Sequence, residues 1–357
     1  MFDGGRNMFY KFPAMKGIQA NNEFYVCMIP LNILSKIFIE EPNDSLPEFR
    51  AQRKLNEVRI PEIRDYILKN RDSYVFSALA ASVDGTMNFT SFNDAEIGEL
   101  EIDINATFLI NDGQHRKAAI LKAIEHDNSL KSETIAVVLY SDKGLMRSQQ
   151  MFTDLNKHAV NASKSLNTLY DSKDPLANIT KQVVDRNSFF RKYTDKEKDN
   201  LGKFSSKFFT LNTLYDANKR IIKSFLLNDL EQKFLLDFWN CVAENMRDWN
   251  EMDNGDLSKR ELRENYIATQ GITIHALGRL GNYLLKNRGY ELSEVLTKLR
   301  EIDWTRSNFE CWKGRAITDS GRINRNEKGI FLTYLQIKRL LGLKIEKDEL
   351  TKEKQQL

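Results

Sequence analysis

The chain has 357 residues, of which 41% are hydrophobic and 29% are charged, so it can bury a substantial core and is not wholly disordered. Its 53 Lys and Arg residues against 50 Asp and Glu residues give a formal net charge of +3, too small by itself to indicate a nucleic-acid-binding protein. Three widely spaced cysteines and four histidines argue against a disulfide framework and against a Cys/His zinc site.

The beginning of the chain carries no pattern of a secretory signal, because residues 1–6 lead into a polar segment. No apolar run approaches the ~20 residues that a membrane-spanning helix needs. We therefore expect a soluble, cytoplasmic protein.

The first part of the chain alternates between strand and helix patterns. Strands are predicted where short apolar runs end at turn residues, and helices where apolar residues recur every three to four positions. The predicted strands are residues 24–29, 74–83, 108–110 and 134–140, and the predicted helices are residues 59–70 and 115–125. The last two strands with the helix between them have the pattern of a βαβ unit, in which the strands are parallel.

From about residue 147, helix patterns replace strand patterns. The predicted helices are 148–155, 178–184, 210–233, 234–249, 272–287, 292–299 and 332–341, and residues 195–200 and 251–256 are polar connectors. We therefore predict an α+β fold with an α/β domain at 1–170, a helical domain with a basic C-terminal region at 171–347, and a frayed tail at 348–357.

The most informative segment is the turn between the strand at 108–110 and the following helix. Gly113 has no Cβ, so the backbone can bend sharply there and approach a ligand closely. The N-terminus of the helix attracts anions, and Arg116 can add a bidentate fork to the same anion. Gln114 and His115 supply hydrogen-bond donors, and Asp112 could hold a metal ion or orient Arg116. The alternative is an ordinary helix cap beside a solvated arginine.

Residues 112–116, Asp-Gly-Gln-His-Arg, followed by Ala118–Ile120, resemble the DGQHR signature of the DndB family of DNA sulfur modification proteins. The resemblance continues at residues 53–64, 72–76, 144–159, 163–166, 205–211 and 312–315. It implies an N-terminal ParB-like or sulfiredoxin-like α/β domain, in which a Gly-x-x-Arg turn contacts nucleotide phosphates. Sulfiredoxins carry a catalytic cysteine in this turn, but this chain has Gln114, so sulfur chemistry is not expected there.

The resemblance also implies further residues of a nucleotide pocket around Gly113 and Arg116. Residues 152–156 resemble an element that accompanies such turns in restriction-associated NTPase domains, which points to Asn156. Arg53 and Arg59 are the arginines of the upstream segment that we expect to reach the same anion. His158 could act as a proton shuttle there, although a solvated or helix-capping histidine explains it equally well.

The positive charge of the chain is unevenly distributed. Residues 313–344 contain eight basic residues and only two acidic ones, Asp319 and Glu327, which favours an anionic partner. We expect DNA contacts from Lys313, Arg315, Arg322, Arg325 and Lys328. A second stretch, residues 186–207, has seven basic residues against three acidic ones, and a solvated face explains it as well as a binding site does.

The sequence leaves three functions open. The first, implied by the resemblance, is a regulator that binds double-stranded promoter DNA and controls the genes of a bacterial DNA phosphorothioation system. Other sulfur-modification proteins and a second copy of the chain are further candidate partners. The alternative is an ATP- and Mg²⁺-dependent nucleotide hydrolase, with or without DNA nicking, whose catalytic residues are Asp112, Gln114, His115 and Arg116, with Asp112 holding the metal. A third option is a turn that binds nucleotide only as a regulatory ligand. Every role for the turn requires an Arg116 guanidinium that is free to meet an anion.

Overall fold

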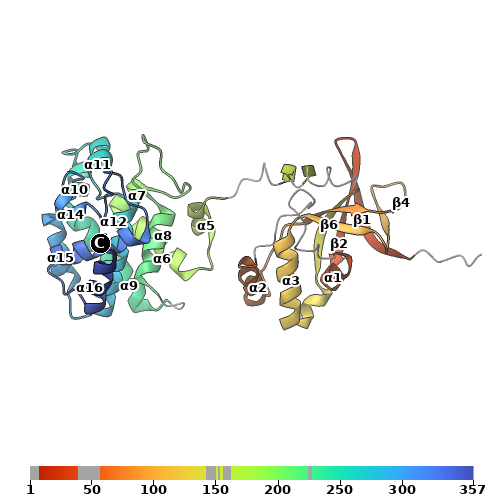
Figure 1. Cartoon of the computed structure of the whole chain (residues 1–357). Helices are drawn as coiled ribbons and strands as arrows, with labels where there is room; N and C mark the ends of the chain where they lie inside the picture. The colour runs from red at the N-terminus through yellow and green to blue at the C-terminus, as the bar shows by residue number, and fades with distance from the viewer. Residues whose placement is uncertain are drawn as a thin grey trace, which may run out of the picture. The chain divides into compact units, whose positions relative to one another are not determined.

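The computed structural model describes residues 8–38, 57–141, 150–151, 153–155, 162–223 and 227–356. The chain divides into two compact units, Met1–Val160 and Asn161–Leu357 (Figure 1). The first unit contains a large sheet with helices and the second is mainly helical, so the predicted mixture of α and β structure is confirmed. Among the described residues, no helix is long and apolar enough to cross a bilayer.

The first unit is built on a seven-stranded sheet with the strand order β4-β5-β1-β2-β7-β3-β6. Neighbouring strands are antiparallel except for β3 and β7, which are parallel. The strands are β1 (Phe9–Gln19), β2 (Asn22–Pro30), β3 (Leu79–Asp84), β4 (Met87–Ser91), β5 (Ile97–Asp103), β6 (Thr107–Asp112) and β7 (Thr134–Ser141). The predicted strands at 24–29, 108–110 and 134–140 are confirmed, the strand at 74–83 begins only at Leu79, and β1, β4 and β5 were not predicted.

The predicted βαβ unit is wrong. Helix α3 (Gln114–His126) does connect β6 to β7, through a short 3-10 helix, η3 (Asn128–Ser132). However, β3 lies between these two strands and pairs antiparallel with β6 and parallel with β7, so β6 and β7 run in opposite directions. The apolar strand β3, which is buried from Leu79 to Val83, takes the central place that the sequence pattern could not assign.

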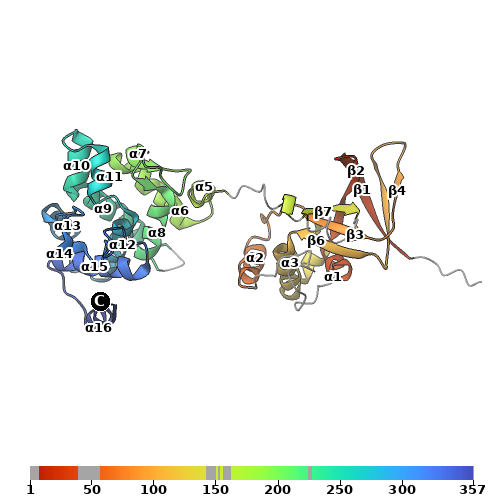
Figure 2. The ribbon, with the colours of Figure 1, turned by 45° about the horizontal axis from the view of Figure 1, so that its top comes forward.

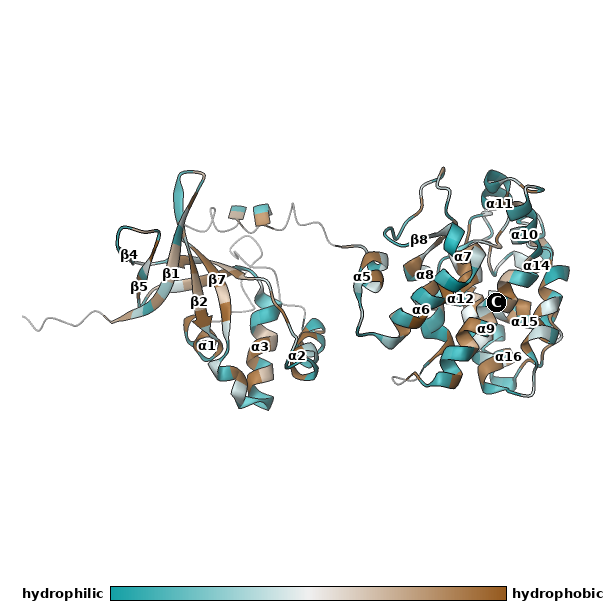
Figure 3. Cartoon of the chain, turned by 180° about the vertical axis from the view of Figure 1, so that it is seen from behind, coloured by the Kyte–Doolittle hydropathy of each residue, from teal (hydrophilic) through white to brown (hydrophobic). Residues whose placement is uncertain are grey.

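The helices of the first unit gather on one side of the sheet, where α2 (Arg59–Lys69) and α3 lie side by side (Figures 1 and 2). The small helices η1 (Leu31–Ile33) and α1 (Leu34–Ile37) lie on the same side. The hydrophobic core of the unit includes Ile67 of α2, Ala123 of α3 and Val137 of β7. Strand β2 is accordingly mostly hydrophobic in Figure 3.

The second unit is a helical bundle with one two-stranded parallel pair, β8 (Thr194–Asp195) and β9 (Phe209–Thr210). Its helices are α5 (Lys164–Tyr170), α6 (Pro175–Arg186), α7 (Ser188–Tyr193), α8 (Leu211–Ile221), α9 (Asp229–Asn245), α10 (Arg247–Asn254), α11 (Lys259–Asn265), α12 (Gly271–Lys286), α13 (Leu292–Thr297), η4 (Lys298–Glu301), α14 (Phe309–Trp312), α15 (Glu327–Leu340) and α16 (Lys347–Gln356). Helix α12 packs against α8 and α15. The approach to α8 is close, because a Cβ at Gly278 would lie 2.7 Å from the Ala217 carbonyl oxygen.

The single helix predicted at 210–233 is two helices. Helix α8 ends at Ile221, and α9 begins after Asn228, whose side chain accepts a hydrogen bond from the Glu231 N–H at 2.9 Å. The Glu231 carboxylate accepts the Asn228 N–H at 3.1 Å, which completes a capping box. The Asn-x-x-Glu signal for this start was present in the sequence. Of the helix predicted at 148–155, the described residues 150–151 and 153–155 are helical.

The expectation of a frayed tail at 348–357 is wrong for residues 348–356. They form most of α16, which is held against α15 by ion pairs. Lys338 Nζ lies 2.7 Å from Glu349 Oε2, and Arg339 Nη1 donates to Glu353 Oε1 at 2.7 Å. The acidic side chains of the tail thus find buried or half-buried basic partners, which a polar sequence alone does not reveal.

Candidate functional site

The turn at residues 112–116 has the predicted local shape. Strand β6 ends at Asp112, Gly113 takes a φ of +102°, and α3 begins at Gln114. A Cβ at position 113 would lie 2.3 Å from Leu79 Cδ2 and 3.2 Å from Arg116 Nη2. The glycine therefore makes room for two side chains of the chain itself.

The Arg116 side chain is only 17% exposed and is held by internal acceptors on both of its terminal nitrogens. Nη1 donates to the Ser77 carbonyl oxygen at 2.5 Å, to Ser77 Oγ at 2.6 Å and to the Ala78 carbonyl oxygen at 2.9 Å. Nη2 donates to Asp112 Oδ2 at 2.7 Å. These bonds fasten the first turn of α3 to the segment that leads into β3, and an incoming anion would have to displace Ser77 or Asp112.

The other residues of the motif differ in their surroundings. His115 interacts with another part of the protein, as does the buried Lys117. The Gln114 Nε2 atom is buried and has no hydrogen-bond partner among the described residues. Gln114 is therefore the side chain of the motif with an unused donor.

Asp112, the predicted Mg²⁺ ligand, is paired with Arg116 in the structure. One of its carboxylate oxygens accepts the Arg116 hydrogen bond, and the described part of the chain contains no group of three or more His, Cys, Asp or Glu side chains that could hold a metal ion. The sequence-based role that the geometry supports for Asp112 is the orientation of Arg116.

Of the remaining predicted pocket residues, Arg59 alone is among the residues that the structure describes. Arg53, Asn156 and His158 lie outside the described residues. Arg59 is the exposed first residue of α2, and among the described residues no hydrogen bond or ion pair connects it to the turn.

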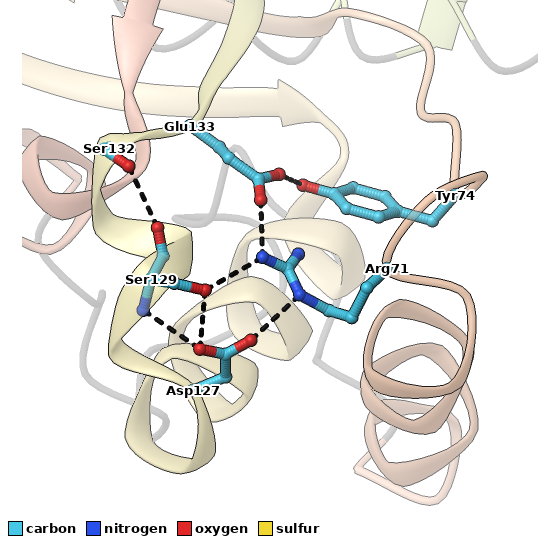
Figure 4. Close-up of polar contacts among 6 residues, drawn as sticks. All are labelled: Arg71, Tyr74, Asp127, Ser129, Ser132 and Glu133. Carbon is cyan, nitrogen blue, oxygen red and sulfur yellow. Dashed lines mark hydrogen bonds and ion pairs between the residues drawn. The ribbon is translucent and has the colours of Figure 1, made fainter.

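A polar network that was not predicted lies in the same unit (Figure 4). Arg71 Nε contacts Asp127 Oδ2 at 2.8 Å, and its Nη2 contacts Glu133 Oε1 at 2.7 Å. The Tyr74 hydroxyl donates to the same Glu133 carboxylate, and burial together with this hydrogen bond raises the pKa of Tyr74 to about 12. Arg71, Tyr74 and Glu133 also line a cavity of about 470 Å³. The network joins the segment after α2 to η3 and β7. It was not found from the sequence because Arg71 and Glu133 are 62 residues apart.

In the second unit, much of the predicted basic excess at 313–344 is neutralised. Lys338, Arg339 and Lys344 pair with Glu349, Glu353 and Glu346, which lie beyond that stretch of sequence. Lys313 lies 3.7 Å from Asp319. Glu327, one of the two acidic residues within the stretch, is occupied by Arg220 and Arg279 of neighbouring helices.

Within residues 313–344, four basic residues are left without a carboxylate partner among the described residues. Arg322, Arg325 and Lys328 are exposed and form no ion pair with any described residue. Arg315 is half-buried, and its Nη1 donates to the Cys311 carbonyl oxygen at 3.4 Å. Of the five predicted DNA contacts, the three within residues 322–328 are therefore the ones that are exposed and without an ion pair among the described residues.

Comparison with known proteins gives one match. The model of the DndB family, described as DNA-sulfur modification-associated, matches residues 12–344, which is nearly the whole chain. No curated protein and no solved structure matches the chain.

Proposed function

The chain belongs to the DndB family of DNA-sulfur modification-associated proteins, and on this premise we propose that it binds double-stranded DNA and regulates transcription of the modification genes. The observation that carries the proposal is the exposed segment 322–328. Its Arg322, Arg325 and Lys328 have no carboxylate partner among the described residues, while Glu327 beside them is turned to Arg220 and Arg279.

A DNA backbone is the partner that suits such a segment. Phosphates attract unpaired lysines and arginines without regard to sequence, and each contact releases counterions and so makes the affinity fall with salt. Promoter specificity must come from additional contacts, since an exposed basic segment positions a protein on DNA without reading its bases.

Binding of a fluorescent duplex from the modification-gene promoter tests the proposal. We expect Arg322→Ala and Lys328→Ala each to weaken binding by roughly three- to tenfold at moderate salt and to reduce the slope of log affinity against log salt by about one. Lys286→Ala is the matched control, because this exposed lysine at the end of α12 also lacks an ion pair in the described chain. The proposal fails if the wild type does not bind the duplex or if all three variants bind it equally well.

Nucleotide hydrolysis at the turn 112–116 is the second proposal, and the unused Gln114 Nε2 donor is the observation in its favour. It requires Arg116 to exchange Asp112 and Ser77 for a phosphate. Release of phosphate from ATP in the presence of Mg²⁺, abolished by Gln114→Ala and not by Lys286→Ala, would support it. A ParB-like role for this turn, in which it contacts nucleotide phosphates, is part of this second proposal.

A further inference from the structure

A cavity of about 550 Å³ lies within the helical unit, which is in the size range of small-molecule sites. Its wall brings together the two basic stretches noted in the sequence, Lys203 from the first and Arg325 from the second. Arg263 and Arg306 also line it, together with Asp199 and His275. Four cationic side chains therefore share one cavity with a single carboxylate.

The two deeper arginines have no carboxylate partner among the described residues. Arg263 Nη2 donates to the carbonyl oxygens of Ser205 at 2.8 Å and Lys207 at 2.6 Å. Arg306 Nη2 donates to the Arg263 carbonyl oxygen at 3.0 Å, and its Nε to that of Tyr266 at 3.3 Å. Burial lowers the pKa of both guanidinium groups. Cations held out of water without a counter-ion are costly unless an anion approaches them.

The acidic groups nearby are already occupied. Asp199 accepts the backbone N–H groups of Lys164 and Ser165 at 2.8 Å each, at the start of α5. Glu264 accepts a hydrogen bond from Arg260 at 3.1 Å and lies 3.6 Å from Lys203 Nζ. Neither carboxylate pairs with Arg263 or Arg306, so the cavity keeps an excess of positive charge.

Two further features of the wall suit an anion. Helix α12 begins there, with Gly271 and Ile272 on the lining, and a helix N-terminus presents N–H groups and partial positive charge. His275, one turn further on, has a buried Nε2 without a hydrogen-bond partner among the described residues. An oxygen-rich anion in the cavity would offer a hydrogen-bond partner to both the N-terminus of α12 and His275 Nε2.

We propose that this cavity binds the phosphate group of a nucleotide, with Arg263 and Arg306 as its inner ligands and Lys203 and Arg325 at its rim. The nucleotide can be a free molecule or part of a DNA strand, since both present the same phosphate. The inference does not depend on DNA binding by Arg322 and Lys328.

Calorimetric titration of the full chain with deoxyadenosine monophosphate, and separately with inorganic phosphate, tests the site. We expect saturable binding by the wild type, weakened at least about fivefold by Arg306→Gln and about two- to fivefold by Lys203→Ala and Arg325→Ala. The two rim variants keep the test valid if Arg306→Gln does not fold, because both side chains are exposed. Lys286→Ala is the control, because this lysine lies at the other end of α12 from the cavity. The helix has 16 residues, so at 1.5 Å per residue the lysine is roughly 22 Å from the start of the helix.

Competition between the monophosphate and duplex DNA separates the two sources. If the monophosphate displaces the duplex, the cavity binds a phosphate of DNA. If the protein binds both at once, the cavity binds a free nucleotide. The inference is overturned if neither monophosphate nor phosphate binds and Lys203→Ala, whose lysine lies outside the segment 322–328, binds duplex as the wild type does. It is also overturned if Lys286→Ala weakens binding as much as Lys203→Ala.

Discussion

Arg116 Nη2 donates to Asp112 Oδ2 at 2.7 Å, so the first and last residues of the motif at 112–116 are bound to each other. The same guanidinium reaches back to Ser77 and Ala78 before β3. The motif thus closes on itself and ties together three segments of the first unit. Internal packing and hydrogen bonds account for Asp112, Gly113 and Arg116 before any ligand is considered, and this gives the first two predictions.

Gly113→Ala should destabilise the first unit by about 2–4 kcal/mol, because the added Cβ meets Leu79 and because a positive φ is unfavourable for alanine. Urea unfolding followed by circular dichroism measures the change. Gly202→Ala is the control, since nothing lies within 4 Å of a Cβ at that position, and its effect should stay within about 0.5 kcal/mol. Equal effects of the two substitutions would contradict the packing described here.

Arg116→Ala should cost about 2–4 kcal/mol of unfolding free energy, because it removes the donors to the Ser77 and Ala78 carbonyl oxygens. Asp112→Asn should cost only about 1 kcal/mol, since the Asp112 side chain is 47% exposed and Arg116 keeps its other acceptors. Denaturant titration of both variants gives the comparison. A larger loss for Asp112→Asn than for Arg116→Ala would show that the ion pair, and not the carbonyl contacts, holds the turn.

Lys338→Ala should destabilise the second unit strongly, by about 3–5 kcal/mol, because Lys338 is fully buried and Glu349 would lose its ion-pair partner. Lys338→Met should be milder, since its length still fills the space beside the Tyr283 ring, whose centroid lies 3.5 Å from Lys338 Nζ. Thermal unfolding of both variants, with the exposed Lys347→Ala as control, measures this. Similar melting temperatures for Lys338→Ala and Lys347→Ala would disprove it.

Asp248 should make the second unit less stable as pH rises. Burial raises the pKa of Asp248 to about 6, above the ~3.9 of an unfolded aspartate, so the folded chain binds the extra proton between these values. Unfolding free energy should therefore fall from about pH 4 to pH 6, by on the order of 2–3 kcal/mol, and then level off. Asp248→Asn should remove this slope in urea titrations across that range.

Asp253 provides the contrasting case. Hydrogen bonds from Lys192 and Tyr193 lower its pKa, so its stabilising contribution is present above the unfolded value and is lost as pH falls through the lower folded value. Asp253→Asn should therefore leave the slope between pH 4 and pH 6 in place and reduce the loss of stability at lower pH. An Asp248→Asn chain with the same change of stability between pH 4 and pH 6 as the wild type would contradict the assignment to Asp248.

Local features of the fold could be predicted from the sequence, and long-range ones could not. The bend at Gly113 and the helix from Gln114 follow from residue types within a few positions. The placement of β3 between β6 and β7 depends on strand pairing across the unit, which no local pattern encodes. The strand β1 was missed although its partner β2 was found, because its apolar residues Phe12 and Ala14 are interrupted by Pro13.

For the candidate sites, the residue types were recognised but their partners were not. Arg116 was identified, yet its bonds to Ser77 and Ala78 span 39 and 38 residues. The two basic stretches were noted separately, and only the fold brings Lys203 and Arg325 to one cavity. Arg263 and Arg306 were not singled out from the sequence, since Arg263 lies among alternating charges in α11 and Arg306 is a single arginine in a loop.

The pairing of α15 with α16 has a practical consequence for anyone who shortens this protein. Lys338 and Arg339 form ion pairs with Glu349 and Glu353. A truncated chain ending before residue 346 would therefore leave two cations unpaired that are neutralised in the intact protein. Such a fragment would attract any polyanion, and its affinity for nucleic acid would be an artefact of the cut. Experiments that compare binding strengths should keep the acidic tail in place.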